Sequence, residues 1–168
     1  MALKQFESAD TAVVARPTGF GKFQAEIAVR GGTILADEPA EVGGGGTGPT
    51  PYELLSAALA ACTAMTLRLY ADRKGWTLPP FNVAVAHSIV PGSGDERPRD
   101  HFERRIELEA PLDDERRAKL LEIADKCPVH RTLERGFTVS TVIGEAVAPP
   151  LGEAPAQHER DMERSCAD

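Results

Sequence analysis

The sequence predicts an α+β fold in which two antiparallel β-meanders surround one central apolar helix. Three observations carry this prediction. Polar and apolar residues alternate before residue 37 and again after residue 80, an Ala/Leu-rich run starting at Pro51 separates these regions, and amphipathic helical spacing returns over 113–126. A chain of 168 residues with 42% hydrophobic content can build one core. We therefore expect one domain over 1–144, followed by a disordered tail over 145–168 that is rich in Pro, Ala and charge.

The first meander is predicted from three short strand patterns. Residues 11–16 and 22–30 flank the Gly- and Pro-containing turn 17–21, and the second stretch alternates polar with apolar side chains. The pair Gly31-Gly32 marks another turn, and 33–36 is the third strand. Three antiparallel strands in sequence order follow from this pattern.

The central helix has clear end signals. Thr50, Pro51 and Glu53 form a capping box with proline at the first helical position, and Gly75 can end the helix in the left-handed conformation. The preceding Gly-rich stretch 43–49 lacks the Lys-Ser/Thr ending of a phosphate-binding loop. We interpret it as a flexible approach to the helix. Because the helix is apolar on nearly every side, we expect protein to enclose it.

The second half predicts another meander and two helices. Strand patterns over 81–90 and 101–110 flank a polar hairpin loop. An amphipathic helix over 113–126 carries acidic residues in its first turn, and a short helix follows over 128–134. A last strand is expected over 138–143.

Charge and hydropathy exclude several classes of function. A net charge of −7 without a basic stripe argues against nucleic acid as a partner. The start of the sequence has no apolar signal-like region, and no run of about 18 uncharged apolar residues could span a bilayer. We expect a soluble, cytoplasmic protein without a membrane partner.

The cysteines indicate redox chemistry. A cytoplasmic chain rarely carries a structural disulfide framework, so its three cysteines are expected to be either reactive or merely buried. Cys62 lies inside the apolar helix, whereas Cys127 opens a short helix whose dipole favours a thiolate. One thiol as nucleophile and the other as its resolving partner is the redox interpretation, and ordinary core packing is the other. Cys166, in the tail, is expected to be a free exposed thiol.

Three segments together resemble the OsmC/Ohr family: 48–55 (GPTPYELL), 60–63 (AACT) and 127–130 (CPVH). The resemblance covers roughly 12–143, and the Cys-Pro-Val-His form is closer to the OsmC-like, YhfA-like branch than to organic hydroperoxide resistance proteins proper. It implies an intertwined homodimer with active sites at the subunit interface. It also implies an antioxidant enzyme of oxidative-stress defence that reduces organic hydroperoxides, with hydrogen peroxide as a further candidate, through a redox-active disulfide regenerated by an external dithiol.

The resemblance also assigns roles by position. Cys62 matches the peroxidatic cysteine, Cys127 the resolving cysteine, and Glu53 the active-site glutamate that pairs with an arginine in Ohr-type members. The capping box explains Glu53 equally well. No metal, flavin or other cofactor is implied. No residue matches the family's arginine near the first hairpin; Arg16, Lys22 and Arg30 are candidates, although each is also explained as a solvated charge at a strand edge.

Two other functions stay open. A non-catalytic module could bind a small apolar ligand beside the alanine-rich helix. Alternatively, Cys62, Cys127 and His130 supply the ligand types of a zinc site, although Cys-x-x-His is the only spacing that supports it. His130 could instead orient a substrate, or be a solvated residue of a short surface helix.

Overall fold

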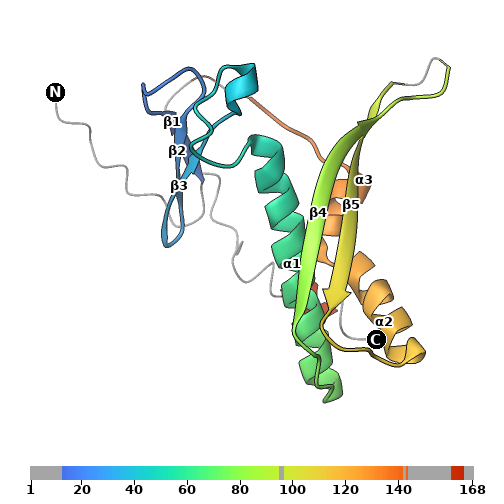
Figure 1. Ribbon diagram of the computed structural model, residues 1–168. Helices are drawn as coiled ribbons and strands as arrows, with labels where there is room; N and C mark the ends of the chain where they lie inside the picture. The colour runs from blue at the N-terminus through green and yellow to red at the C-terminus, as the bar shows by residue number, and fades with distance from the viewer. Residues whose placement is uncertain (1–12, 95–96, 142, 144–159, 165–168) are drawn as a thin grey trace. The chain divides into compact units, whose positions relative to one another are not determined.

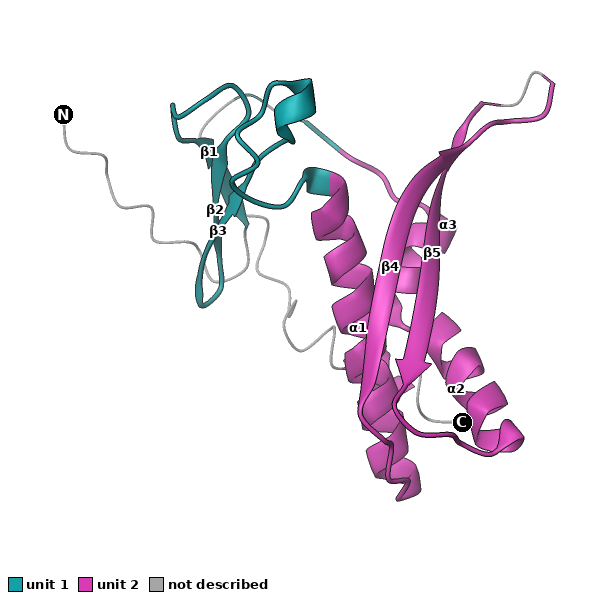
Figure 2. Cartoon of the chain, viewed as in Figure 1, with its two compact units in different colours: residues 1–51, 140–155 teal, residues 52–139, 156–168 magenta. Residues whose placement is uncertain are grey.

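The computed structural model describes residues 13–94, 97–141, 143 and 160–164. The chain forms two compact units, of which one comprises 1–51 and 140–155 and the other 52–139 and 156–168 (Figure 2). Within the expected tail, residues 160–164 are helical. The rest of that tail, including Cys166, lies outside the described residues.

The first unit contains a three-stranded antiparallel sheet in the order β1-β2-β3 (Figure 1). Its strands are β1 (Val14–Pro17), β2 (Ala25–Val29) and β3 (Gly32–Ala36), and Ile27 of β2 is paired with Ile34 of β3. The predicted meander is confirmed; β1 and β2 are shorter than expected, and β3 begins one residue earlier. A single 3-10 turn, η1 (Ala40–Val42), follows β3.

The Gly-rich stretch after η1 is held in place by a buried carboxylate. Asp37 is 3% exposed and accepts hydrogen bonds from the Gly45 backbone N–H at 3.0 Å and from the Thr47 hydroxyl at 2.9 Å. Although burial alone would raise the pKa of Asp37, the hydrogen bonds from Thr47, Glu38 and Gly45 outweigh it and lower that pKa. The prediction that this stretch is a flexible lead into the helix is therefore wrong. The Asp37 carboxylate accepts hydrogen bonds from the loop and holds it in one conformation.

Two glycines of this stretch are required by close backbone contacts. A Cβ atom on Gly44 would overlap the backbone of Glu38, and one on Gly48 would overlap the backbone of Leu35. Neither neighbour is the end of a flexible side chain, so neither can move aside cheaply.

The second unit is built on a long helix and a β-hairpin. α1 (Pro51–Lys74) lies beside β4 (Phe81–Val90) and β5 (Arg99–Leu108), and α2 (Asp114–Asp125) and α3 (Pro128–Arg135) complete the unit (Figure 1). The predicted bounds of α1 and β4 are confirmed. β5 begins and ends two residues earlier than predicted. Asp113 caps α2 through a hydrogen bond from the Arg116 backbone N–H.

Two clusters of buried side chains hold this unit together. The first joins α1, α2 and the hairpin around Leu67, Tyr70 and Ile123. The second joins α1, α3 and the hairpin around Leu59 and the two cysteines. Full burial of a leucine or isoleucine side chain stabilises the fold by about 1.5–3 kcal/mol. The candidate site is therefore built into a structural core.

The expected last strand, 138–143, does not form. Residues 138–141 and 143 have no strand partner in the described part of the chain, and Val139 is 77% exposed. A strand needs a neighbour for its backbone hydrogen bonds, so high β-propensity alone does not make one. Among the described residues the second sheet is consequently the β4–β5 hairpin rather than a meander.

Only one face of α1 is buried, contrary to the expected enclosed helix. The buried face includes Leu59, Cys62 and Leu67, whereas Leu55 and Met65 are 43% and 54% exposed. The apolar composition of the helix is thus not accounted for by the described chain alone.

By length and composition, α1 is also able to cross a membrane, with a mean hydropathy of 1.5 over an 18-residue window. The expectation that no segment could span a bilayer is corrected, because this helix is long and apolar enough despite charged residues such as Arg68. Core helices of soluble proteins can be equally long and equally apolar. The packing of α1 on α2 and the hairpin explains its apolar residues on that face without a bilayer.

Candidate functional site

Cys62 and Cys127 meet in the second core cluster. Their Sγ atoms lie 2.9 Å apart although the residues are 65 positions apart in the sequence. Both are free thiols, and their exposed fractions are 3% and 0%. Two sulfurs at this distance satisfy the contact that disulfide chemistry requires.

The local structure presents Cys127 to the start of a helix. Cys127 is the N-cap of α3, with φ −55° and ψ 133°, and Pro128 occupies the first helical position. No hydrogen bond joins the Cys127 side chain to the start of α3, but the backbone N–H groups of Val129 and His130 lie close enough to lower the pKa of its thiol. These N–H groups have no carbonyl partner within the helix, so they are available to an anion.

The two thiols share their protons unequally. Hydrogen bonding with Cys62 lowers the pKa of Cys127 to about 6 against the opposing effect of burial, and the His130 N–H and the Thr63 hydroxyl contribute further. The pKa of Cys62 is raised, first by its hydrogen bond with Cys127 and then by burial. Near neutral pH the pair therefore carries one negative charge, held mainly on Cys127.

Arg104 is a site residue that the sequence analysis missed. Its side chain is 12% exposed, and Nη1 donates hydrogen bonds to Thr63 Oγ1 at 3.1 Å and to the Ala124 carbonyl at 2.9 Å. Nη2 forms an ion pair with Asp125 at 2.7 Å. The Thr63 hydroxyl donates to the Leu59 carbonyl at 2.8 Å, and the Thr63 side chain also lowers the pKa of Cys127, so one side chain interacts with both the guanidinium and the thiol. A cation thus supports the thiol pair through Thr63.

A signal for Arg104 was present in the strand pattern. Side chains at alternate positions of β5 face the core, and these positions hold Phe102, Arg104, Ile106 and Leu108. Arg104 is the one charged residue in this inward-facing set. A charge on an otherwise apolar strand face needs a partner, which marks it as a functional candidate.

Glu53 is placed away from the sulfurs along the same helix. It is an exposed residue of the first turn of α1, nine positions before Cys62. At about 1.5 Å rise per residue this corresponds to roughly 13 Å along the helix axis. The catalytic role implied for Glu53 stays a prediction.

The three basic residues considered for the family's arginine all belong to the first unit. Arg16 lies in β1, paired in register with Glu26, while Lys22 lies over the Phe23 ring at 4.6 Å. Arg30 is exposed at the turn between β2 and β3. Within the second unit, the cation connected to the thiols is Arg104.

His130 contributes its backbone rather than its ring to the sulfur. Its Nε2 lies 3.7 Å from Glu134 Oε2, one helical turn away. Within the described residues, no group of three or more His, Cys, Asp or Glu side chains is arranged to hold a metal ion. The zinc alternative built on Cys62, Cys127 and His130 thus has no geometric support there.

An aromatic stack borders the thiol cluster. The ring of His87 stacks on Tyr52 with centroids 4.1 Å apart and lies 4.9 Å from Phe102, which packs against the cysteines. His87 Nε2 also lies 2.8 Å from Asp100 Oδ1. The sequence predicted no role for His87. In the structure its ring contacts Phe102, which in turn packs against the cysteine cluster.

Comparisons with known proteins agree with this fold. The sequence model of the family described as OsmC-like protein matches residues 43–142. No curated protein matches the chain at the sequence level.

Three solved structures illustrate the likeness. A Psychrobacter arcticus protein named for osmotic stress induction and a detoxification response is 19% identical, with a TM-score of 0.60 over 72% of this chain and 86% of that one. An organic hydroperoxide resistance protein OsmC from Legionella pneumophila is 19% identical, with a TM-score of 0.54 over 71% and 87% of the two chains. The organic hydroperoxide resistance protein OhrB of Bacillus subtilis is 22% identical, with a TM-score of 0.54 over 71% and 87%. The likeness confirms the α+β fold class.

Proposed function

This chain belongs to the OsmC-like protein family, and on that premise we propose that it is a cysteine-based peroxidase that reduces organic hydroperoxides. The observation that carries the proposal is the 2.9 Å contact between the Cys62 and Cys127 sulfurs. The hydroperoxide resistance proteins that share the fold support the choice of substrate class. Hydrogen peroxide is a second candidate substrate.

The proposed reaction needs only the two thiols, the peroxide and a reductant. The Cys62 sulfur attacks the distal oxygen of the hydroperoxide, an S–O bond forms as the O–O bond breaks, and the leaving alkoxide takes a proton to become an alcohol. Cys127 then attacks the sulfur of the resulting sulfenic acid. The S–S bond forms and hydroxide leaves as water, and an external dithiol reduces the disulfide.

The unequal pKa values fit this division of roles. A more basic thiolate is the stronger nucleophile, so the minor form with its charge on Cys62 reacts faster per molecule with peroxide. The Val129 N–H and the Thr66 side chain each lower the pKa of Cys62, which makes that minor form accessible. Cys127, whose thiolate is populated near neutral pH, is ready to resolve the sulfenic acid and is the better leaving group when the disulfide is reduced.

Arg104 acts in this proposal as a positioning residue. Its guanidinium donates to Thr63 Oγ1, whose own proton goes to the Leu59 carbonyl, and this fixes the side chain that lowers the pKa of Cys127. The contacts of Arg104 with Ala124 and Asp125 also hold the end of α2 next to Cys127. In this way Arg104 supplies the cation that the first hairpin was expected to supply.

We extend the proposal to the assembly and its location. A homodimer is supported by the exposed apolar residues of α1, which a second copy could cover. Such an assembly is also the route by which Glu53 could join an active site. We also propose a cytoplasmic location, where a reducing thiol pool would return a bridged pair to free thiols.

The test is consumption of cumene hydroperoxide by the purified full chain with dithiothreitol as reductant. Cys62→Ser is expected to abolish turnover, while the matched control Cys166→Ser, which also removes one thiol, retains it. With cumene hydroperoxide and no dithiothreitol, Cys127→Ser should stop after one oxidation and accumulate a sulfenic acid on Cys62, detected by mass spectrometry. Full activity in Cys62→Ser, or no turnover in the wild type together with a stoichiometric co-purified apolar ligand, would reject the peroxidase in favour of the binding module.

A further inference from the structure

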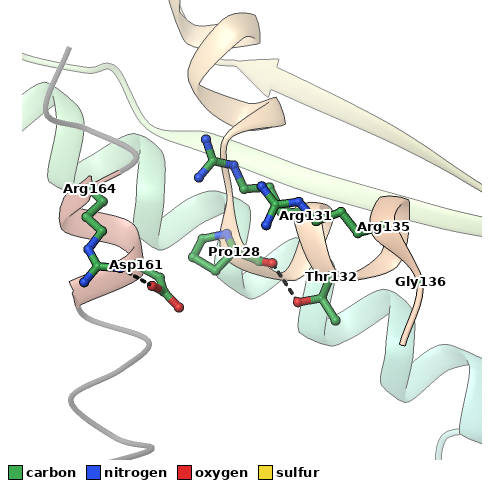
Figure 3. A pocket seen from close by; sticks show the side chains of 7 residues that line it. All are labelled: Pro128, Arg131, Thr132, Arg135, Gly136, Asp161 and Arg164. Atoms are coloured by element: carbon green, nitrogen blue, oxygen red, sulfur yellow. Dashed lines mark hydrogen bonds and ion pairs between the residues drawn. The ribbon is translucent and has the colours of Figure 1, made fainter. Parts of the chain in front are cut away.

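A pocket of about 350 Å³ lies between α3 and the helical segment 160–164 (Figure 3). Five of its residues belong to α3 or follow it directly, and two come from the segment near the end of the chain. The lining consists of Pro128, Arg131, Thr132, Arg135, Gly136, Asp161 and Arg164.

The charges in this pocket are unbalanced. Three arginines and one aspartate line the pocket, in a chain whose net charge is −7. The carboxylate of Asp161 lies 3.8 Å from Arg164 Nη1. Arg131 and Arg135 form no ion pair with any residue that the structure describes, and like charges four positions apart on a helix repel each other. The two α3 arginines thus leave a local positive charge that no described acid neutralises.

Helix stability does not explain Arg131. A cation near the C-terminus of a helix is stabilised by the helix dipole, and this accounts for Arg135 in the last turn of α3. Arg131 lies in the N-terminal half of the same helix, where the dipole opposes a positive charge. The helix dipole therefore gives Arg131 no stabilisation and does not account for its place in the pocket.

The pocket is separate from the thiol pair. Pro128, Arg131 and Arg135 recur at spacings of three and four and share one face of α3, whereas Val129 and Leu133 pack on the cysteine cluster. With about 100° between successive residues, these two sets lie on different faces of the helix. A ligand in the pocket would therefore contact α3 without touching the sulfurs.

We propose that this pocket binds a small molecule through an anionic carboxylate or phosphate group. Guanidinium groups present planar pairs of N–H donors that match the oxygens of these anions. The Thr132 hydroxyl already donates to the Pro128 carbonyl at 3.1 Å, so the arginines are the main donors left for a ligand. The volume lies within the range of small-molecule sites and exceeds what a single oxyanion needs.

The experiment is isothermal titration of the full chain with sodium phosphate and, separately, with sodium acetate, each at constant ionic strength. Saturable binding of either anion is expected, and the two titrations distinguish a phosphate site from a carboxylate site. Arg131→Gln and Arg135→Gln should each weaken binding about tenfold or more, because each removes a charge-assisted hydrogen bond. Circular dichroism verifies that these variants are folded.

The matched control is Arg105→Gln, which removes the same charge from the outward face of β5. Equal weakening in Arg105→Gln would mean diffuse attraction and would overturn the site, as would wild-type affinity in Arg131→Gln or the absence of saturation with both anions. Cys62→Ser is expected to bind the anion normally. A failed peroxidase assay therefore leaves this inference standing, and a failed titration leaves the peroxidase standing.

Discussion

Arg104 donates a hydrogen bond from Nη1 to the hydroxyl of Thr63 across 3.1 Å, and Thr63 follows Cys62 directly on α1. The Thr63 hydroxyl donates its proton to the Leu59 carbonyl, and the same side chain lowers the pKa of Cys127, so it links a nearly buried cation to the thiol pair. Such a connection favours the charged form of the pair in a site that excludes most water.

Removing the guanidinium should raise the pKa of the thiol pair. We expect Arg104→Gln to shift the pH profile of peroxide reduction upward and to slow the reaction about tenfold near neutral pH, a loss of roughly 1.4 kcal/mol. Arg104→Lys should recover part of the rate because it keeps the charge. Stopped-flow oxidation across a pH series measures both effects.

Arg105→Gln is the control for this variant, since Arg105 neighbours Arg104 on β5 but faces outward and pairs with Glu103 at 3.4 Å. A structural role alone would lower the stability of Arg104→Gln without moving the pH profile. An unchanged profile would therefore contradict the assignment of Arg104 as a positioning residue.

The thiol pair should titrate as a unit with its first midpoint at about 6, the pKa of Cys127. Below that pH both sulfurs are protonated and react slowly; above it the thiolate is populated. Cys62→Ala should raise the Cys127 midpoint, because the hydrogen bond from Cys62 is the largest cause of the low pKa. Ultraviolet absorbance of the thiolate follows this titration.

Cys62→Ser provides the comparison for Cys62→Ala. Serine keeps a hydroxyl donor near Cys127, so its midpoint should lie closer to that of the wild type. If both variants titrate like the wild type, Cys62 does not stabilise the Cys127 thiolate, and the N-terminus of α3 alone accounts for its low pKa.

Substitution of Gly48 should destabilise the first unit. A Cβ atom there overlaps the Leu35 backbone, so we expect Gly48→Ala to lower the free energy of unfolding by about 1–3 kcal/mol, as overpacking does. Gly32→Ala is the matched control, because a Cβ at Gly32 meets nothing within 4 Å. Urea denaturation of the two variants gives the difference, and equal midpoints would show that the loop can shift without cost.

The exposed side of α1 is expected to be an interface between two copies of the chain. Leu55→Glu and Met65→Glu should convert a dimer to a monomer, because each places a charge on a surface that the partner would bury. Leu121→Glu, on an exposed position of α2, is the control. Light scattering after gel filtration measures the mass, and a wild-type monomer at micromolar concentration would refute the assembly.

Much of the fold was predictable because its signals are local. The bounds of α1 follow from a proline at the first helical position and from Gly75, whose φ is 66°, and the bounds of β4 follow from strict alternation. The expected strand over 138–143 failed for the opposite reason. A strand depends on a partner that its own sequence does not contain, and the described chain provides none.

The candidate site divides in the same way. Cys62 and Cys127 were identifiable by residue type and local setting, since a thiol at the start of a helix is favoured as a thiolate whatever lies around it. The sequence by itself thus determined which sulfurs to consider and the helices that carry them. Only the tertiary structure decided that the sulfurs lie 2.9 Å apart and that Arg104, rather than a residue of the first hairpin, is connected to them. The physical reason is that hydrogen bonds and charge interactions act over a few ångströms in space, and the packing of α1, α3 and β5 sets those distances between residues far apart in the chain.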